Sequence, residues 1–303
     1  MQVFRHIPSV KVDSPSPALV LAIGNFDGMH LGHQALLKRL VEVADATGLT
    51  AAVMTFEPHP REFFTPDNAP ARLTSLREKL EFFEDAGVAQ VYICRFNRQF
   101  SGLSAEVFIQ NILRTALNAQ SILVGNDFRF GAKRHGSVAD LLEAGFDLVD
   151  FPEVRLESVR VSSTAVRDAL ATGELELARA LLGRPYSISG KVVHGAKRGR
   201  QLGFPTANVH MRHERPALTG VYAVKLDGLA GVANLGVRPT VAGIPKLMLE
   251  VHLFDFDGDL YDRHVHVQFL KKIREEMKFP DFDALKQQIA LDSIAARTYF
   301  SNI

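Results

Sequence analysis

Two histidines that follow a glycine-rich turn, His30 and His33, carry the clearest chemistry in this 303-residue chain. The turn, residues 24–29, comes directly after the apolar run 18–23, which predicts a buried strand because it is too short for a helix. Apolar residues with helical spacing resume over 34–43, so we predict a strand, a turn and a helix start. The N–H groups of such a helix start suit a phosphate, and imidazoles can donate to its oxygens as charge develops.

The spacing of the glycines in this stretch does not match the two common phosphate loops. It is neither the Gly-x-Gly-x-x-Gly dinucleotide fingerprint nor the Gly-x-x-x-x-Gly-Lys-Ser/Thr P-loop. The stretch from Gly24 to His33 instead resembles the H-x-G-H signature of the nucleotidyltransferase superfamily, in the form found in bacterial bifunctional riboflavin kinases/FMN adenylyltransferases. The resemblance implies that His30 and His33 are catalytic and that Gly24, Phe26 and Gly32 bind ATP.

A second segment with phosphate-binding residue types is Val161-Ser-Ser-Thr-Ala-Val-Arg167. Its hydroxyls are predicted to cap a helix, and Arg167 would follow one turn later with a fork of donors that suits phosphate. On its own the segment fits a plain capped helix with a solvated arginine equally well. It resembles the I-S-S-T-x-x-R motif of the same superfamily, which implies that Ser163, Thr164 and Arg167 bind the phosphates of ATP.

Strands and helices alternate through the first half of the chain. Helices are predicted at 34–43, 75–87, 104–117 and 137–144, between strands at 18–23, 50–56, 90–94, 121–124 and 146–151. This order predicts an α/β fold, a Rossmann-like domain with a parallel sheet and helices on both faces. Ligands of such sheets bind beyond the carboxyl ends of the strands, where the segments 24–33, 57–60 and 125–131 lie. The resemblance implies that Asn126 and Asp127 bind the flavin.

The pattern changes after Gly183, so we predict one domain over residues 1–183 and a second over residues 184–303. Turns such as Asp227-Gly228 then separate predicted strands at 186–193, 221–226, 229–235, 246–254 and 265–270. Many short strands with few helices between them predict an antiparallel β-barrel. Apolar residues with helical spacing over 281–299 predict one closing helix after it.

The barrel begins with a glycine-rich, basic stretch that ends in Pro205-Thr206-Ala207-Asn208. Thr206 and Asn208 would face the same way in an extended segment, and their neutral oxygens suit Mg²⁺. The basic residues alone would fit a solvated loop. The whole stretch resembles the riboflavin kinase signature, which implies that Thr206 and Asn208 hold the metal and that ATP is bound by Gly195, Lys197 and Gly203.

Transfer of a phosphate to a hydroxyl needs a carboxylate to accept the proton. Glu250 alternates with apolar neighbours on a predicted strand, and a glutamate in that position can also simply face water. The stretch from Glu250 to Tyr261 resembles the family segment whose leading Glu is the catalytic base. The family usually has Gly after that Tyr, where this chain has Asp262, which tolerates a left-handed conformation. Arg274 lies in another family-like stretch and is a candidate contact for the flavin or the nucleotide.

The composition is that of a globular protein and is compatible with a reducing compartment. Hydrophobic residues make up 47% and charged residues 23%, and the net charge of +1 gives no general attraction to nucleic acid or an anionic membrane. We find no signal-peptide core, no membrane-length apolar run and a single cysteine. We therefore expect a cytoplasmic protein without nucleic-acid or membrane partners, and a homo-oligomer stays open. His264 and His266 share a predicted strand face without an obvious third ligand, so we predict no zinc site there.

The two blocks of motifs stand in the order that the bifunctional family has, and together they cover nearly the whole chain. The resemblance implies that ATP phosphorylates riboflavin to FMN and then transfers AMP to FMN, giving FAD and pyrophosphate, with Mg²⁺ as the cofactor. Alternatives are a protein that keeps only the kinase, an adenylyltransferase for another acceptor, and a flavin-binding or regulatory protein without activity. The presence of all the candidate catalytic residues weighs against the last of these.

Overall fold

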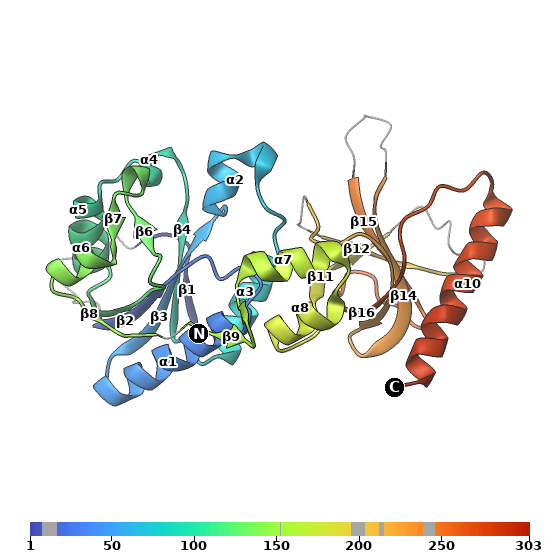
Figure 1. The fold of residues 1–303 in the computed structure, drawn as a ribbon, viewed down its shortest axis with the longest axis horizontal. Helices are drawn as coiled ribbons and strands as arrows, with labels where there is room; N and C mark the ends of the chain where they lie inside the picture. The colour runs from blue at the N-terminus through green and yellow to red at the C-terminus, as the bar shows by residue number, and fades with distance from the viewer. Residues whose placement is uncertain (8–16, 152, 195–203, 212–214, 239–245) are drawn as a thin grey trace. The chain divides into compact units, whose positions relative to one another are not determined.

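A computed structural model describes residues 1–7, 17–151, 153–194, 204–211, 215–238 and 246–303 (Figure 1). The chain forms two compact units: the first holds Met1–Pro70 and Leu76–Val161, and the second holds Ala71–Ser75 and Ser162–Ile303. Of the predicted site residues, Gly195, Lys197 and Gly203 lie outside the described residues. The domain boundary after Gly183 stays a prediction, because this division places residues 162–183 with the barrel.

A six-stranded sheet forms the centre of the first unit. All its neighbouring strands pair in parallel, in the order β1 (Gln2–Phe4), β4 (Gln90–Arg95), β3 (Thr50–Glu57), β2 (Leu19–Ile23), β5 (Ala119–Leu123) and β8 (Asp147–Leu148). From β2 the chain builds the sheet outward through β3 to β4, and it then returns to place β5 on the other side of β2. The strand order therefore reverses beside β2, which is where open α/β sheets bind ligands.

Helices cover both faces of this sheet, as predicted (Figure 1). Alternate residues of β2 enter two different cores: Leu19, Leu21 and Ile23 face one, and Val20 and Ala22 face the other. The helices α1 (Leu31–Thr47) and α3 (Leu76–Asp85) pack in the second core, and α6 (Val138–Glu143) contributes to the first. A parallel strand that is buried on both faces explains why its sequence is continuously apolar.

The longest predicted helix of this unit, residues 104–117, takes a different form. Ser104 caps it as predicted, but α5 (Ala105–Val107) continues as a π-helix, η2 (Phe108–Ala116). The Leu117 N–H donates to the Ile112 carbonyl, the i→i+5 bond of a π-turn. The buried side chains recur every three or four residues, which is the spacing of an α-helix, so the sequence pattern does not reveal the π-helix.

The other differences in this unit concern short elements. The strand predicted at 146–151 is reduced to β8, and β1 was not predicted. The short segments that the sequence did not reveal also include α2 (Pro60–Phe64), η1 (Pro66–Asn68), α4 (Arg98–Ser101), β6 (Arg129–Phe130), η3 (Ala132–Arg134), β7 (Gly136–Ser137), β9 (Arg155–Leu156) and β10 (Val159–Arg160). Elements of two to five residues contain too few side chains to show a period.

The second unit is built on a closed, antiparallel six-stranded barrel, as predicted. Its order is β11 (Ser187–Val193), β12 (Ala207–His210), β15 (Lys246–Leu253), β14 (Leu229–Arg238), β13 (Gly220–Leu226) and β16 (His264–Arg274). The helices α7 (Ser163–Thr172) and α8 (Leu175–Leu182) precede it, and α10 (Phe282–Ser301) closes it. Within the described ranges, no helix combines the length and the apolar character that crossing a membrane would require.

An ion pair fastens α10 to the barrel. The Arg274 guanidinium, at the end of β16, donates to both carboxylate oxygens of Asp292 on α10, at 2.7 to 3.1 Å. The side chains are only 17% and 4% exposed. Beside them, Ala296 of α10 packs on Val221 and Val232 of the barrel. Because both charges are largely removed from water, each depends on the other for compensation.

Asp292→Ala should therefore destabilise the attachment of α10 by about 3 kcal/mol, because it leaves a largely buried guanidinium without its carboxylate. Hydrogen exchange of the α10 amides measures this loss. Asp255→Ala is the matched control, since it removes an exposed carboxylate that also pairs with an arginine, Arg297, and should leave exchange of the same amides nearly unchanged. Equal protection in both variants would show that the Arg274 pair does not hold the helix.

Candidate functional site

The two histidines of the first unit stack on each other at the start of α1. His30 is the N-cap residue, only 7% exposed, and its Nδ1 accepts a hydrogen bond from the His33 backbone N–H at 3.3 Å. Because Nδ1 accepts, the proton of a neutral His30 lies on Nε2. The ring centroids are 3.7 Å apart with an angle of 18° between the planes. A Cβ at position 32 would lie 3.1 Å from the His30 ring, so Gly32 leaves room for the stack.

The surroundings of His33 favour its neutral form. Its ring packs against Phe26 at 5.2 Å, and Phe26 packs edge-on against Phe83 of α3. Burial first, and then the positive charges of His30 and Lys79, hold the pKa of His33 well below its ordinary value. The His33 Nδ1 is buried and makes no hydrogen bond within the described part of the chain. The site therefore gathers basic groups around a neutral imidazole.

The three predicted ligand segments of this unit lie at one edge of the sheet. Residues 24–33, 57–60 and 125–131 follow β2, β3 and β5, and β2 pairs in parallel with each of the other two strands. Phe26, predicted to bind ATP, is only 1% exposed, and its ring packs against His33 and Phe83. Asn126 and Asp127 are exposed in a turn that a bond from the Phe128 N–H to the Gly125 carbonyl closes.

The second phosphate motif begins α7, and one of its hydroxyls caps this helix, as predicted. The capping side chain is that of Ser162, whose hydroxyl accepts from the Ala165 N–H at 3.2 Å. Ser163 and Thr164 are the first residues of the helix itself. One turn later, the Arg167 Nε–H donates to the Ala71 carbonyl at 2.6 Å, which fixes the direction of the side chain. These residues belong to the second unit.

In the barrel, strand register brings three polar side chains into one row. Asn208 of β12 pairs with Glu250 of β15, and Glu250 pairs with Asn234 of β14. Asn208 is buried, and the other two are partly buried. Asn234 was not predicted from the sequence. An asparagine inside the apolar strand Val-Ala-Asn-Leu is unusual, and that is the signal that could have drawn attention to it.

A cavity of about 320 Å³ in the same unit includes Thr206 in its lining, whereas none of the three residues of the polar row contributes to it. The strands contribute the apolar residues Val192, Val251 and Leu253, and the loop 256–261 contributes the carboxylates of Asp257 and Asp259. Hydroxyl and carboxylate oxygens are the donors that hard divalent cations prefer. The cavity therefore combines an apolar wall with oxygen ligands.

The remaining predicted residues of this unit are held by neighbouring groups. The Arg274 guanidinium is bound to Asp292, donates to the Glu275 carbonyl and lies 5.6 Å from the Phe279 ring. Asp262 adopts a left-handed conformation with φ of 63°, as expected where the family has Gly. A hydrogen bond and an ion pair from Lys191 lower the pKa of its carboxyl.

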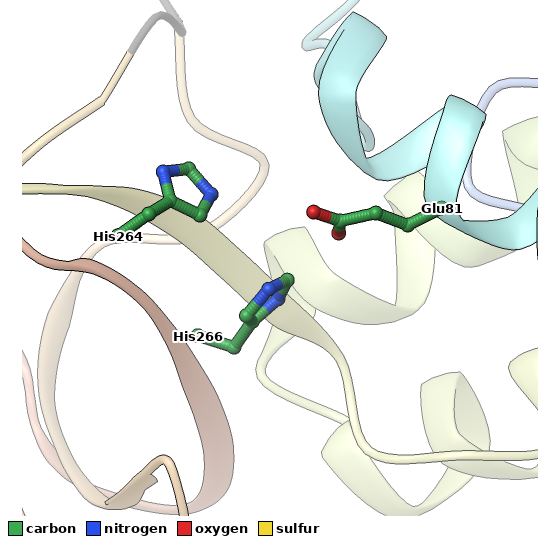
Figure 2. Close-up of side chains that lie close together, drawn as sticks. All are labelled: Glu81, His264 and His266. Atoms are coloured by element: carbon green, nitrogen blue, oxygen red, sulfur yellow. The ribbon is translucent and has the colours of Figure 1, made fainter.

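His264 and His266 lie on the same face of β16, with ring centroids 5.6 Å apart (Figure 2). Figure 2 also labels Glu81, which belongs to α3 of the first unit. Among the described residues of the second unit, no third ligand joins the histidine pair. The expectation that the pair holds no zinc stays a prediction.

Comparisons with known proteins divide the chain into two matches. The family model described as FAD synthetase matches residues 13–165, and the model described as riboflavin kinase matches residues 182–300. The first match contains the stacked histidines and the first residues of α7. The second contains the barrel, the polar row and α10.

Full-length relatives show the same combination. The chain is 49% identical over 309 residues to the bifunctional riboflavin kinase/FMN adenylyltransferase of Escherichia coli strain K12, covering 99% of this chain and 98% of that protein. It is 50% identical to the protein of the same name from Pseudomonas fluorescens, over 98% and 97% of the two chains. A solved structure from Streptococcus pneumoniae, named a macrolide-efflux protein, is 31% identical with a TM-score of 0.81, over 98% and 99%.

We predict that Lys79→Met raises the pKa of His33, because it removes one of the positive charges that oppose protonation while burial remains. Titration of the His33 Cε1 proton by NMR measures the change. Lys38→Met, which removes an exposed charge from α1, is the matched control and should leave the titration where it is in the unmodified protein. An unchanged titration in Lys79→Met would rule out this charge as a cause.

Proposed function

Because this chain belongs to the family of bifunctional riboflavin kinases/FMN adenylyltransferases, we propose that its stacked histidines serve FAD formation and that its barrel houses the phosphorylation of riboflavin. The chain is an enzyme with both activities: it makes FMN from riboflavin and FAD from FMN. The observation that carries the assignment of sites is the order of the two family matches, since each covers one of the two polar clusters.

In FAD formation, a phosphate oxygen of FMN attacks the α-phosphorus of ATP. A new P–O bond forms there, the bond to the β-phosphate breaks, and pyrophosphate leaves with the electron pair. No protein nucleophile is required, so the protein acts by stabilising developing negative charge. His30 can donate from Nε2 while its Nδ1 is engaged, and the N–H groups of α1 offer further donors. His33 is held beside His30 by the stack.

Other groups of the proposed FAD-forming machinery come from the motifs. Gly24 and Gly32 allow the backbone to approach the nucleotide closely, and the exposed Asn126 and Asp127 follow the neighbouring strand β5. We assign phosphate binding to Ser163, Thr164 and Arg167 on the strength of the family motif alone. The orientation of Arg167 is already fixed by its bond to Ala71, which lowers the entropy lost on binding a phosphate.

In the kinase reaction, the oxygen of the riboflavin hydroxyl attacks the γ-phosphorus of ATP, and ADP leaves. Glu250 accepts the proton of this hydroxyl. Asn208 and Asn234 are the cross-strand neighbours of Glu250, and both are neutral amides, so neither adds a charge beside the carboxylate. The phosphate-binding roles of Gly195, Lys197 and Gly203 remain sequence-based proposals. Arg274 fits a structural role better than a flavin contact, because Asp292 already pairs with its guanidinium.

We assign Thr206 and Asn208 as the Mg²⁺ ligands of the kinase site. Thr206 lines the cavity together with Asp257 and Asp259, Asn208 follows two residues later and would face the same way in an extended segment, and oxygen donors of this kind fit a hard cation. When bound, Mg²⁺ would neutralise charge on the transferred phosphate. The substrates are small molecules, namely ATP, riboflavin and FMN, and the cytoplasm is the compartment that supplies them.

His33→Ala should reduce FAD formation by about two orders of magnitude or more, since an interaction of this type commonly contributes ~10²–10³ in rate. FMN formation should stay near normal, because the barrel is intact. Product chromatography after incubation with riboflavin and ATP measures both reactions on one preparation. FAD formation at the normal rate would remove His33 from the catalytic machinery.

Glu250→Gln should lower kinase turnover by ~10²–10⁴, the usual cost of losing a general base. The Michaelis constants should change little, because the amide can still make hydrogen bonds. FAD formation from supplied FMN is the internal control and should stay normal. Glu176→Gln, at an exposed position of α8, is the matched control for loss of a negative charge. Normal FMN formation in Glu250→Gln would direct the search for the base to Asp255, Asp257 or Asp259.

A further inference from the structure

A histidine near the proposed kinase residues makes a hydrogen bond that has no role in the proposed reaction. His252 lies on β15, two residues beyond Glu250, and its Nδ1 lies 2.9 Å from the carbonyl oxygen of Pro205. A carbonyl can only accept, so Nδ1 carries the proton and donates. Pro205 directly precedes Thr206, the proposed metal ligand. One imidazole thus connects the strand of the proposed base to the segment of the proposed ligand.

This bond lies where the ladder between β12 and β15 ends. Asn208 pairs with Glu250 and Ala207 pairs with Val251, and β12 begins at Ala207. Two residues further back, Pro205 has no N–H to donate. The His252 side chain therefore supplies a hydrogen bond at the point where the backbone ladder stops. Thr206 lies between the last ladder pair and this bond, so its backbone is fixed on both sides.

Two aromatic rings hold the imidazole in this orientation. Phe204 packs edge-on against His252 with ring centroids 5.3 Å apart, and Phe254 does so at 5.9 Å. Phe204 belongs to the segment that the hydrogen bond holds, and Phe254 follows β15. The His252 side chain is partly buried, whereas Pro205 is exposed, so the two rings rather than burial of the bond limit the movement of the imidazole.

We propose that His252 is a positioning residue that holds Thr206 in place for Mg²⁺ and the phosphates of ATP. The inference rests on the proposed function, because Thr206 has been assigned as a ligand on that basis. His252 contacts the segment of the ligand and not the reacting atoms. Groups that orient metal ligands in this way typically contribute ~10–100-fold to metal affinity.

Three substitutions separate the hydrogen bond from the ring packing. His252→Phe keeps an aromatic ring and loses the donor. His252→Asn loses the ring but places an amide donor close to the position of Nδ1, and His252→Leu has the branched shape of Asn without a donor. The Asn and Leu pair keeps the comparison possible if the Phe variant does not fold, and the rate of FAD formation from FMN verifies that each preparation is intact.

Two measurements report on the metal. The first is the Mg²⁺ concentration that gives half-maximal FMN formation, together with turnover at saturating Mg²⁺. The second does not depend on activity: Mn²⁺ is titrated in the presence of ADP and free Mn²⁺ is followed by electron paramagnetic resonance. We expect the Phe and Leu variants to need ~10-fold more metal in both assays, with turnover at saturation nearly retained, and the Asn variant to stay close to the unmodified protein.

Thr206→Val, measured in parallel, separates failure of the inference from failure of the proposed function. If Thr206→Val weakens metal binding while His252→Phe and His252→Leu do not, the inference about His252 is wrong and the ligand assignment stands. If Thr206→Val leaves metal binding unchanged, the ligand assignment itself is wrong. Equal losses in the Asn, Phe and Leu variants would attribute the effect to the imidazole ring and overturn the role of the hydrogen bond.

Discussion

The stack of two imidazoles at the start of α1 is the constraint around which the first unit is arranged. It places two basic rings against the positive end of a helix and near a buried lysine. Such an arrangement is unfavourable by itself, because like charges repel and burial penalises each of them. A neutral His33 ring reduces the repulsion, and the apolar packing of Phe26 and Phe83 beside it supplies the compensating stability. The same positive potential favours a polyphosphate.

The barrel brings together residues that are far apart in the sequence. Positions 208, 234 and 250 become neighbours because β12, β15 and β14 are adjacent and in one register. A shift of one residue in either pairing would turn Glu250 to the other face of its strand. The apolar residues that alternate with the polar row therefore fix the positions of its three side chains as well as the core.

Local signals predicted much of this molecule, and contacts between distant segments account for most of what they missed. The β2 strand, the turn and α1 could be predicted because a glycine-rich break separates an apolar strand pattern from a helical one. The barrel could be predicted from the turns between its strands. The π-helix over Phe108–Ala116 was not visible, because its buried side chains have a spacing that α-helices share. The sequence did not predict that Asn234 lies opposite Glu250 or that Asp292 forms an ion pair with Arg274. Cross-strand register and helix docking depend on contacts between distant segments, and no local sequence pattern indicates them. The roles of the predicted site residues stay proposals.

Closure of the barrel has a consequence for how the protein is made. The first strand of the barrel, β11, pairs with β12 on one side and with β16 on the other. The second of these partners, β16, begins only at His264. During synthesis, the six strands of the first unit have all emerged once Leu148 is available, whereas β11 must wait for more than 70 further residues, with a free edge exposed. Pairing across such a separation is slow. The sheet of the first unit, with its stacked histidines, can thus assemble on the ribosome well before the barrel closes.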